Sequence, residues 1–215
     1  MEIKYFLVIP LIVWLLVNIS VVRSIRLLSK PKDLLKEVDL IESDAFTKKN
    51  NVFSEWCKKN GFEHEKYFHF SGILNGPPIE CSAWWSETDK TWALIYIAST
   101  DKNVDFVSTF SDGTSITTAS TKDSLTLPLP PESYFQAFTR LENSERYGLH
   151  KQAIADIEHK YGASRLNRRR DLFAEISDSI LRQTKFIKKM RFWYLRGSYW
   201  YFVTRNLKVN KPVKY

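Results

Sequence analysis

Glycine and cysteine are both scarce in this chain, with seven glycines and two cysteines among 215 residues. Nucleotide-binding loops depend on closely spaced glycines that let the backbone approach a phosphate. The sequence has no Walker motif and no dinucleotide-binding fingerprint, which argues against folds of that kind. Cys57 and Cys81 lie far apart, so the chain is not a disulfide scaffold. We expect free thiols in a cytoplasmic domain, whereas export would allow the two cysteines to pair.

Sequence patterns of familiar catalytic sites are also missing. There is no Gly-x-Ser-x-Gly nucleophile elbow. His64 and His69 are five residues apart, one more than the zinc-protease helix requires. Cys57 follows Trp56 on the apolar face of a predicted helix, which favours a buried thiol over a nucleophile. We therefore assign no catalytic, cofactor-binding or metal-ligating residue and expect no cofactor.

Charge is distributed unevenly along the sequence. The net charge is +8, yet residues 161–215 alone carry 14 Lys/Arg and three Asp/Glu, which gives +11. The remainder of the chain therefore carries −3. Such a basic segment predicts an anionic partner, either phospholipid head groups or nucleic acid.

A long uncharged run opens the chain. Residues 5–22 contain no charged side chain and are mostly aliphatic. About 20 helical residues cross a hydrocarbon core of roughly 30 Å, so residues 1–23 are predicted to be a single-pass transmembrane anchor. Residues 24–32 are expected to form a polar linker.

Basic residues after this run predict its orientation. Arg23, Arg26, Lys30 and Lys32 follow it closely, so the positive-inside rule places the C-terminal domain in the cytoplasm, on the inner side of the cell membrane. Two alternatives stay open. A cleaved signal peptide is disfavoured by the lack of a small-x-small pair near residues 20–24, and a buried core helix is disfavoured by the length of the run.

Residues 33–163 are predicted to form an α+β domain. Apolar spacing indicates a helix over residues 33–59, followed by strands at residues 79–86, 91–99, 104–111 and 114–120. Asp112-Gly113 predicts a two-residue hairpin turn that places Ser111 opposite Thr114. Val104, Phe106 and Phe110 would then share the core face. The predicted fold is an N-terminal transmembrane helix, a helix, a four-stranded antiparallel meander and C-terminal helices, with helical segments beginning near residues 131, 150 and 167.

The segment 164–215 combines basic and aromatic residues. On one continuous helix, Phe186, Trp193, Tyr194 and Tyr201 share an apolar sector, and most of the cations lie on another side. The separation is incomplete, because Phe192, Tyr199 and Phe202 fall near or between the cations. Because Trp and Tyr prefer the head-group layer and Lys and Arg attract anionic lipids, this pattern favours a helix lying on the cytoplasmic leaflet. A core helix with its cations at the edge is the alternative. The predicted contact residues are Lys185, Lys188, Lys189, Arg191, Trp193, Tyr194, Arg196, Trp200 and Tyr201.

A second basic cluster lies near the start of this segment. Arg165, Arg168, Arg169 and Arg170 are candidate contacts for nucleic acid or phospholipid. No complete nucleic-acid recognition motif surrounds them, so we expect lipid rather than nucleic acid as the partner.

Function is left between two main hypotheses. The first is a membrane-anchored interaction or scaffold protein that binds an unknown protein partner through an exposed strand edge containing Thr109, Ser115, Thr117 and Thr118. The second is an enzyme of unrecognised type with a pocket lined by Trp84, Trp85 and Trp92. A membrane-tethered nucleic-acid binder is a third and weaker hypothesis.

Overall fold

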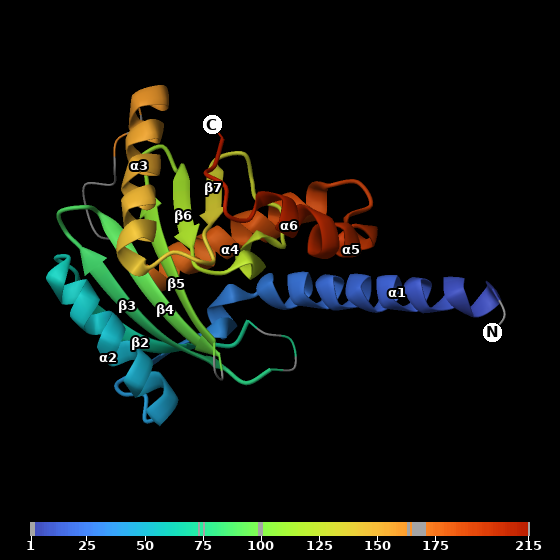
Figure 1. Ribbon diagram of the computed structural model, residues 1–215, viewed down its shortest axis with the longest axis horizontal. Coiled ribbons are helices and arrows are strands. Elements are labelled where there is room, and N and C mark those ends of the chain that lie inside the picture. The colour runs from blue at the N-terminus through green and yellow to red at the C-terminus, as the bar shows by residue number, and fades with distance from the viewer. Residues whose placement is uncertain are drawn as a thin grey trace.

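The computed structural model shows an α+β protein with an N-terminal apolar helix, one further helix, a mostly antiparallel sheet and C-terminal helices (Figure 1). The structure describes residues 3–72, 74, 76–98, 101–162, 164 and 171–214, without the side chains of residues 3–7, 98 and 101. The helices are α1 (Ile3–Leu28), α2 (Asp44–Lys59), α3 (Asn143–Tyr161), α4 (Leu172–Lys189), α5 (Gly197–Tyr199) and α6 (Arg205–Lys208), with a π-helix at Trp200–Thr204 and 3-10 turns at Pro31–Leu34, Lys122–Leu125 and Trp193–Leu195.

In the part of the chain that is described, seven strands form one sheet whose spatial order follows the sequence. Neighbouring strands are antiparallel except for β6 and β7, which are parallel. The four predicted strands correspond to β3 through β6, and the sheet gains β1, β2 and β7. The strands are β1 (Leu35–Val38), β2 (Glu63–Phe70), β3 (Ile79–Ser86), β4 (Thr91–Ala98), β5 (Asp101–Thr109), β6 (Ser115–Ala119) and β7 (Ser133–Ala137).

Helices cover both faces of this sheet, and strand alternation divides the core between them. On one face Trp84 and Phe106 pack with Phe53 of α2 and Tyr147 of α3. On the other face Trp85 and its neighbours pack against the first turns of α4. The predicted core face of Val104, Phe106 and Phe110 is confirmed, since all three side chains are buried.

The predicted hairpin at Asp112-Gly113 is present, but its register differs by one residue. Thr109 pairs with Ser115, and the Phe110 amide donates to the Thr114 carbonyl, so the turn contains three residues rather than two. Gly113 has φ +88°, a conformation that suits glycine. The Asp112 carboxylate accepts from the Thr114 amide, which stabilises the longer turn.

Two predicted helical segments are wrong in part. Residues 35–38 form β1, which pairs with β2, so the predicted helix over residues 33–59 begins only at Asp44. Ser43 provides the N-terminal cap by accepting from the Phe46 amide. Residues 133–137 form β7 instead of a helix, because they complete the sheet beside β6.

The predicted C-terminal helix over residues 167–206 is interrupted. Residues 165–170 lie outside the described residues, and α4 ends at Lys189. Met190 is extended and Phe192 has φ +55°, so the chain turns before its next helical turns. A single helical wheel therefore does not describe residues 185–205. At the other end of the protein, α1 continues to Leu28, so the first part of the predicted linker is helical.

Candidate membrane-contact site

The first half of α1 projects away from the sheet (Figure 1). Residues 8–16 are all exposed, and Ile9 and Leu11 have exposed fractions of 65% and 62%. The window Val8–Leu28 is long and apolar enough to cross a membrane, and only 17% of it is buried. This helix therefore fits either a single-pass anchor or a signal sequence.

The C-terminal segment runs along the second half of α1. Near its start, the Lys188 ammonium donates to the Ser29 hydroxyl at 2.6 Å. Ten residues later, the Ser198 hydroxyl donates to the Trp14 carbonyl at 3.0 Å. These contacts are about 20 Å apart along α1 at 1.5 Å per residue. The chain thus runs beside α1 toward its N-terminal half and then returns to the sheet. There the backbone N–H of Asn210 donates to the Ala137 carbonyl.

A buried asparagine joins the two segments. Asn18 has only 3% of its side chain exposed, although it lies in the middle of the apolar run. Its amide nitrogen donates to the Ser198 hydroxyl at 2.9 Å, and its amide oxygen accepts from the Gly197 backbone at 2.8 Å. A Cβ atom at Gly197 would lie 2.8 Å from the Val21 Cβ. Only glycine allows this approach, as is common where helices pack in membranes.

An apolar cluster lies next to this polar contact. Ile25 of α1, Ile187 of α4 and Trp200 are almost fully buried against one another, with Val21 and Trp193 at the edge. Burial of a large apolar side chain stabilises by about 2 kcal/mol. One side of the second half of α1 therefore packs into this cluster.

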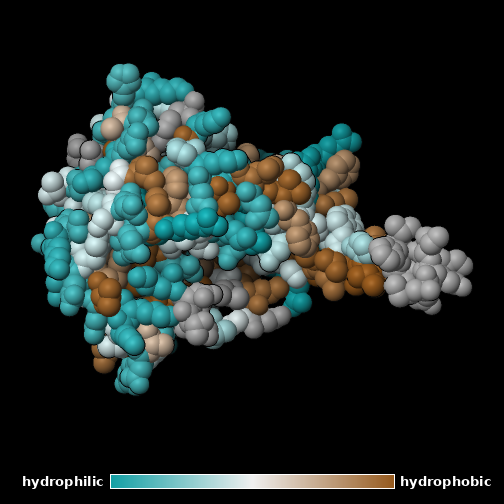
Figure 2. All heavy atoms as spheres, viewed as in Figure 1, coloured by the Kyte–Doolittle hydropathy of each residue, from teal (hydrophilic) through white to brown (hydrophobic). Residues whose placement is uncertain are grey.

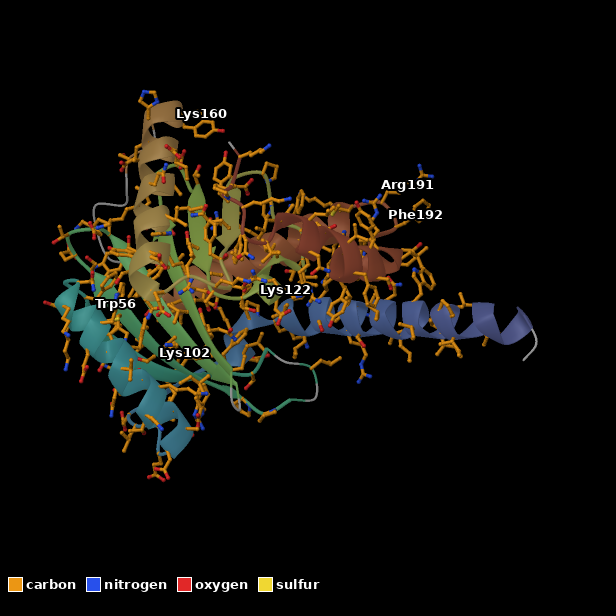
Figure 3. All side chains as sticks on the ribbon, in the orientation of Figure 1. Trp56, Lys102, Lys122, Lys160, Arg191 and Phe192 are labelled. Carbon is orange, nitrogen blue, oxygen red and sulfur yellow. The ribbon has the colours of Figure 1, made fainter. Side chains whose placement is uncertain are left out.

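The outer surface of the C-terminal segment is rich in exposed aromatic and aliphatic side chains. We call this surface the aromatic collar, and Figure 2 shows apolar surface on this segment continuing onto α1. Arg191 and Phe192 project outward from it (Figure 3). The collar consists of Phe192, Tyr194, Leu195, Tyr199, Tyr201, Phe202, Val203 and Leu207, which are all exposed.

The residues predicted to contact the membrane divide into two groups. Trp200 is buried at 4% exposure and Trp193 is half-buried, so these two mainly hold the segment against α1. The candidates Arg165, Arg168, Arg169 and Arg170 lie outside the described residues. The other predicted contacts are exposed: Lys185, Lys188, Lys189, Arg191, Tyr194, Arg196 and Tyr201.

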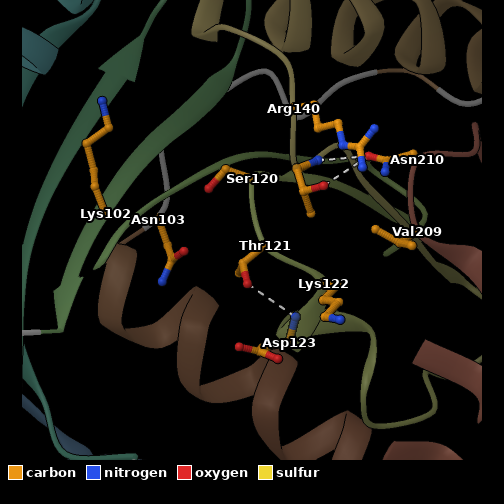
Figure 4. A pocket seen from close by; sticks show the side chains of 10 residues that line it. Lys102, Asn103, Ser120, Thr121, Lys122, Asp123, Arg140, Val209 and Asn210 are labelled. Atoms are coloured by element: carbon orange, nitrogen blue, oxygen red, sulfur yellow. Dashed lines mark hydrogen bonds between the residues drawn. The ribbon is translucent and has the colours of Figure 1, made fainter. Parts of the chain in front are cut away.

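A hollow of about 520 Å³ opens where β5 begins and β6 and β7 end. We call it the cationic hollow because Lys102, Lys122 and Arg140 line it (Figure 4). Its acidic group is Asp123, whose carboxylate accepts from the Arg205 guanidinium at 2.6 Å. The remaining lining residues are polar apart from Val209: Asn103, Ser120, Thr121, Thr139 and Asn210.

A second hollow, of about 580 Å³, lies beside α1. We call it the anchor hollow. Asp123 lines both hollows, so they adjoin. Arg205 is 9% exposed, lies over the Tyr201 ring at 3.9 Å, and has a buried Nε without a partner among the described residues. The lining residues are Ser20, Ser24, Gly72, Leu74, Asp123, Thr126, Tyr201 and Arg205.

Two other sets of predicted functional residues do not form the expected sites. Trp84, Trp85 and Trp92 are core side chains that donate to Ser82, Glu87 and Glu175, and neither hollow is lined by them. The predicted pairing edge is wrong because β6 lies between β5 and β7. Thr118 is fully buried and contacts His150 and Gln136.

Histidines and acidic residues are dispersed among the described residues. His64 and His69 lie on β2, where the His64 ring contacts Tyr67 at a tilt and Trp84 edge-on. Burial and the nearby Lys58 charge lower the pKa of His64. No group of three or more His, Cys, Asp and Glu side chains in the described part of the chain is placed to hold a metal ion.

The two cysteines are free thiols buried on opposite faces of the sheet. Burial raises the pKa of both thiols. We expect a maleimide to modify neither cysteine in the native protein and both after denaturation, because the thiolate is the reactive form. Intact mass before and after denaturation measures this. Rapid labelling of the native protein would contradict the packing of Cys57 and Cys81.

The packing of the C-terminal segment against α1 is interpreted from the residues of this chain alone. No protein-family model, curated protein or solved structure matches the chain. What the protein does is therefore inferred above all from the contact between α1 and the C-terminal segment.

The sequence analysis did not identify two parts of the contact between α1 and the C-terminal segment. Asn18 interrupts the apolar run, and a polar side chain within such a run commonly marks a partner. Gly197-Ser198 is a pair of small residues between aromatic neighbours, a pattern that allows close helix packing. The two hollows had no signal in the sequence, since their lining residues come from distant segments.

Proposed function

We propose that the protein is a membrane-anchored interaction protein. Its α1 helix is retained as the anchor, and its α+β domain is held at the cytoplasmic face. The observation that carries this proposal is the buried contact of Asn18 with Gly197 and Ser198. This contact joins α1 to the C-terminal segment, so the domain would be held directly against the membrane.

Retention of α1 is supported over cleavage of a signal peptide. Cleavage at residues 22–24 would remove Asn18, the buried partner of Gly197 and Ser198, and would remove Val21 from the edge of the apolar cluster around Trp200. An exposed apolar patch of this kind is unfavourable in a soluble protein. Signal sequences are not expected to contribute to the core of the mature domain.

The aromatic collar favours lipid contact beside the anchor. Trp and Tyr side chains prefer the interface between head groups and hydrocarbon, and the collar lies alongside residues 14–29 of α1. We infer a folded segment inserted into the interface, rather than one continuous helix lying on it. Arg23 and Arg26 near the end of α1 and Lys188 in α4 are then on the cytoplasmic side, as the positive-inside rule requires.

Fractionation of cells that express the full chain tests the proposal. We expect the protein to stay in membranes through high salt and alkali, with the mass of the uncleaved chain. A tag after Tyr215 is expected to be digested in inverted vesicles and protected in intact cells. Release of a soluble protein about 22 residues shorter would contradict the retained anchor, and digestion in intact cells would contradict the orientation.

A further inference from the structure

The cationic hollow has an excess of positive charge. Lys102 and Arg140 are exposed at its rim, and the Lys122 ammonium donates to the Asn206 side chain at 3.2 Å. Asp123 is the one carboxylate among the lining residues, and the Arg205 guanidinium already pairs with it. Three cations therefore line the hollow, and the charge of its one carboxylate is already balanced by Arg205, so the hollow favours an anionic ligand.

Hydroxyl groups of the hollow are arranged to donate. The Ser120 hydroxyl accepts from the Val104 amide at 2.7 Å, and the Thr121 hydroxyl accepts from the Asp123 amide at 3.3 Å. These bonds use an oxygen lone pair, so each hydroxyl keeps its hydrogen for another acceptor. A phosphate group has several acceptor oxygens and binds both hydroxyl donors and cations.

The position of the hollow indicates where such a phosphate would come from. Asp123 separates the cationic hollow from the anchor hollow, which is lined by Ser20 and Ser24 of α1. These serines flank Arg23, at the end of the apolar run where the head-group layer would begin. Leu74 and Tyr201 give the anchor hollow an apolar wall.

We propose that the cationic hollow binds the phosphate of an anionic phospholipid in the cytoplasmic leaflet, with the glycerol end directed through the anchor hollow. Lys122 and Arg140 contact the phosphate, and Ser120 and Thr121 donate to it. The proposal rests on the proposed membrane anchoring. Soluble phosphate compounds share this chemistry, but the adjoining anchor hollow favours a lipid.

Lipid titration of the purified full chain in neutral detergent tests the site. The probes are short-chain phosphatidylglycerol, short-chain phosphatidylcholine and inorganic phosphate, and binding is read by native mass spectrometry. We expect the anionic lipid to bind at least about 10-fold more tightly than either other probe. The variant Lys122→Gln/Arg140→Gln is expected to weaken it roughly 10-fold or more. The variant Lys48→Gln/Lys59→Gln, which removes the same charge from exposed positions of α2, is expected to bind as the parent does.

Three outcomes would overturn the site. They are equal binding of both lipids, equal weakening by the two double variants, and binding of inorganic phosphate as tight as that of the anionic lipid. The last result would assign the hollow to a soluble ligand. Each of them leaves the anchor intact, because fractionation and the tag measure anchoring separately.

Discussion

Replacing Gly197 with leucine is expected to separate the C-terminal segment from α1. Even a Cβ atom at this position would lie 2.8 Å from the Val21 Cβ and 3.1 Å from the Asn18 amide oxygen. The chain must therefore move, which breaks the bonds of Asn18 to Gly197 and Ser198, leaves its amide oxygen unpaired and exposes Trp200. We expect a loss of about 3 kcal/mol in the free energy of unfolding, because overpacking adds to a buried unpaired amide. The apparent Tm in detergent should fall by roughly 6–12 °C.

Gly148 supplies the matched control for this substitution. It lies in α3, and a Cβ atom added there would meet nothing within 4 Å, so Gly148→Leu adds the same atoms without a clash. Helix propensity predicts an unchanged or slightly higher apparent Tm. Trypsin cleavage after Arg191 and Arg196 should become faster in the Gly197 variant alone. Equal Tm values for both variants would contradict the contact.

Replacing Asp105 with asparagine is expected to stabilise the protein at pH 8. Asp105 lies on the sheet face beneath α4, and its buried Oδ1 has no partner among the described residues. Burial raises the pKa of this carboxyl group to about 7, and the Arg146 charge opposes that rise only in part. Ionisation in the folded state is therefore unfavourable.

The pH dependence of the protein's stability follows from proton binding to the Asp105 carboxyl group. Between about pH 4 and pH 7 the unfolded chain has lost the Asp105 proton while the folded chain keeps it, so stability decreases as pH rises. The carboxyl group is expected to cost about 4 kcal/mol at pH 8, because its pKa is raised from 3.8 to about 7, and less than half of that near pH 5. Asp105→Asn removes this cost, so the free energy of unfolding should depend less on pH.

Denaturant unfolding of the full chain between pH 5 and pH 8 measures this effect. Asp156→Asn is the control, because Asp156 is exposed on α3 and the substitution makes the same chemical change. If the free energy of unfolding changed with pH in the same way for the parent and for Asp105→Asn, Asp105 would be ionised in the folded protein at neutral pH, which would contradict the raised pKa.

The central strands and the apolar helix could be predicted from the sequence because their signals are local. The run without charge is visible by itself, and Asp112-Gly113 stands between two β-prone segments. The core face of β5 follows from simple alternation, and Val104, Phe106 and Phe110 are buried as expected.

The missed elements depend on partners that are distant in sequence. Tyr134 and Phe138 fit a helical spacing, but the parallel pairing with β6 makes residues 133–137 a strand. β1 has only four residues and is held by β2. Phe192 turns the chain with a positive φ and without a glycine, so no local residue marked the end of α4. Tertiary contacts override local propensity in each case.

The candidate site was predicted even less completely. The expected lipid-facing side chains are largely exposed, but the folded path of the C-terminal segment was not visible in its composition. Asn18 and Gly197 are 179 positions apart in the chain, and only the structure brings them together. The same holds for Lys102, Lys122 and Arg140 around the cationic hollow.

Cross-linking in membranes tests the central claim, that α1 and the C-terminal segment form one unit, most directly. Cysteines are introduced by Asn18→Cys and Ser198→Cys, whose native side chains lie 2.9 Å apart, while buried Cys57 and Cys81 are left in place. Val8→Cys with Ser198→Cys is the control, about 15 Å farther along α1. Mild oxidation followed by non-reducing peptide mapping should show the Asn18–Ser198 cross-link in most molecules and none in the control. If neither pair, or both pairs equally, were cross-linked in the membrane, the docking of the C-terminal segment on α1 would be contradicted.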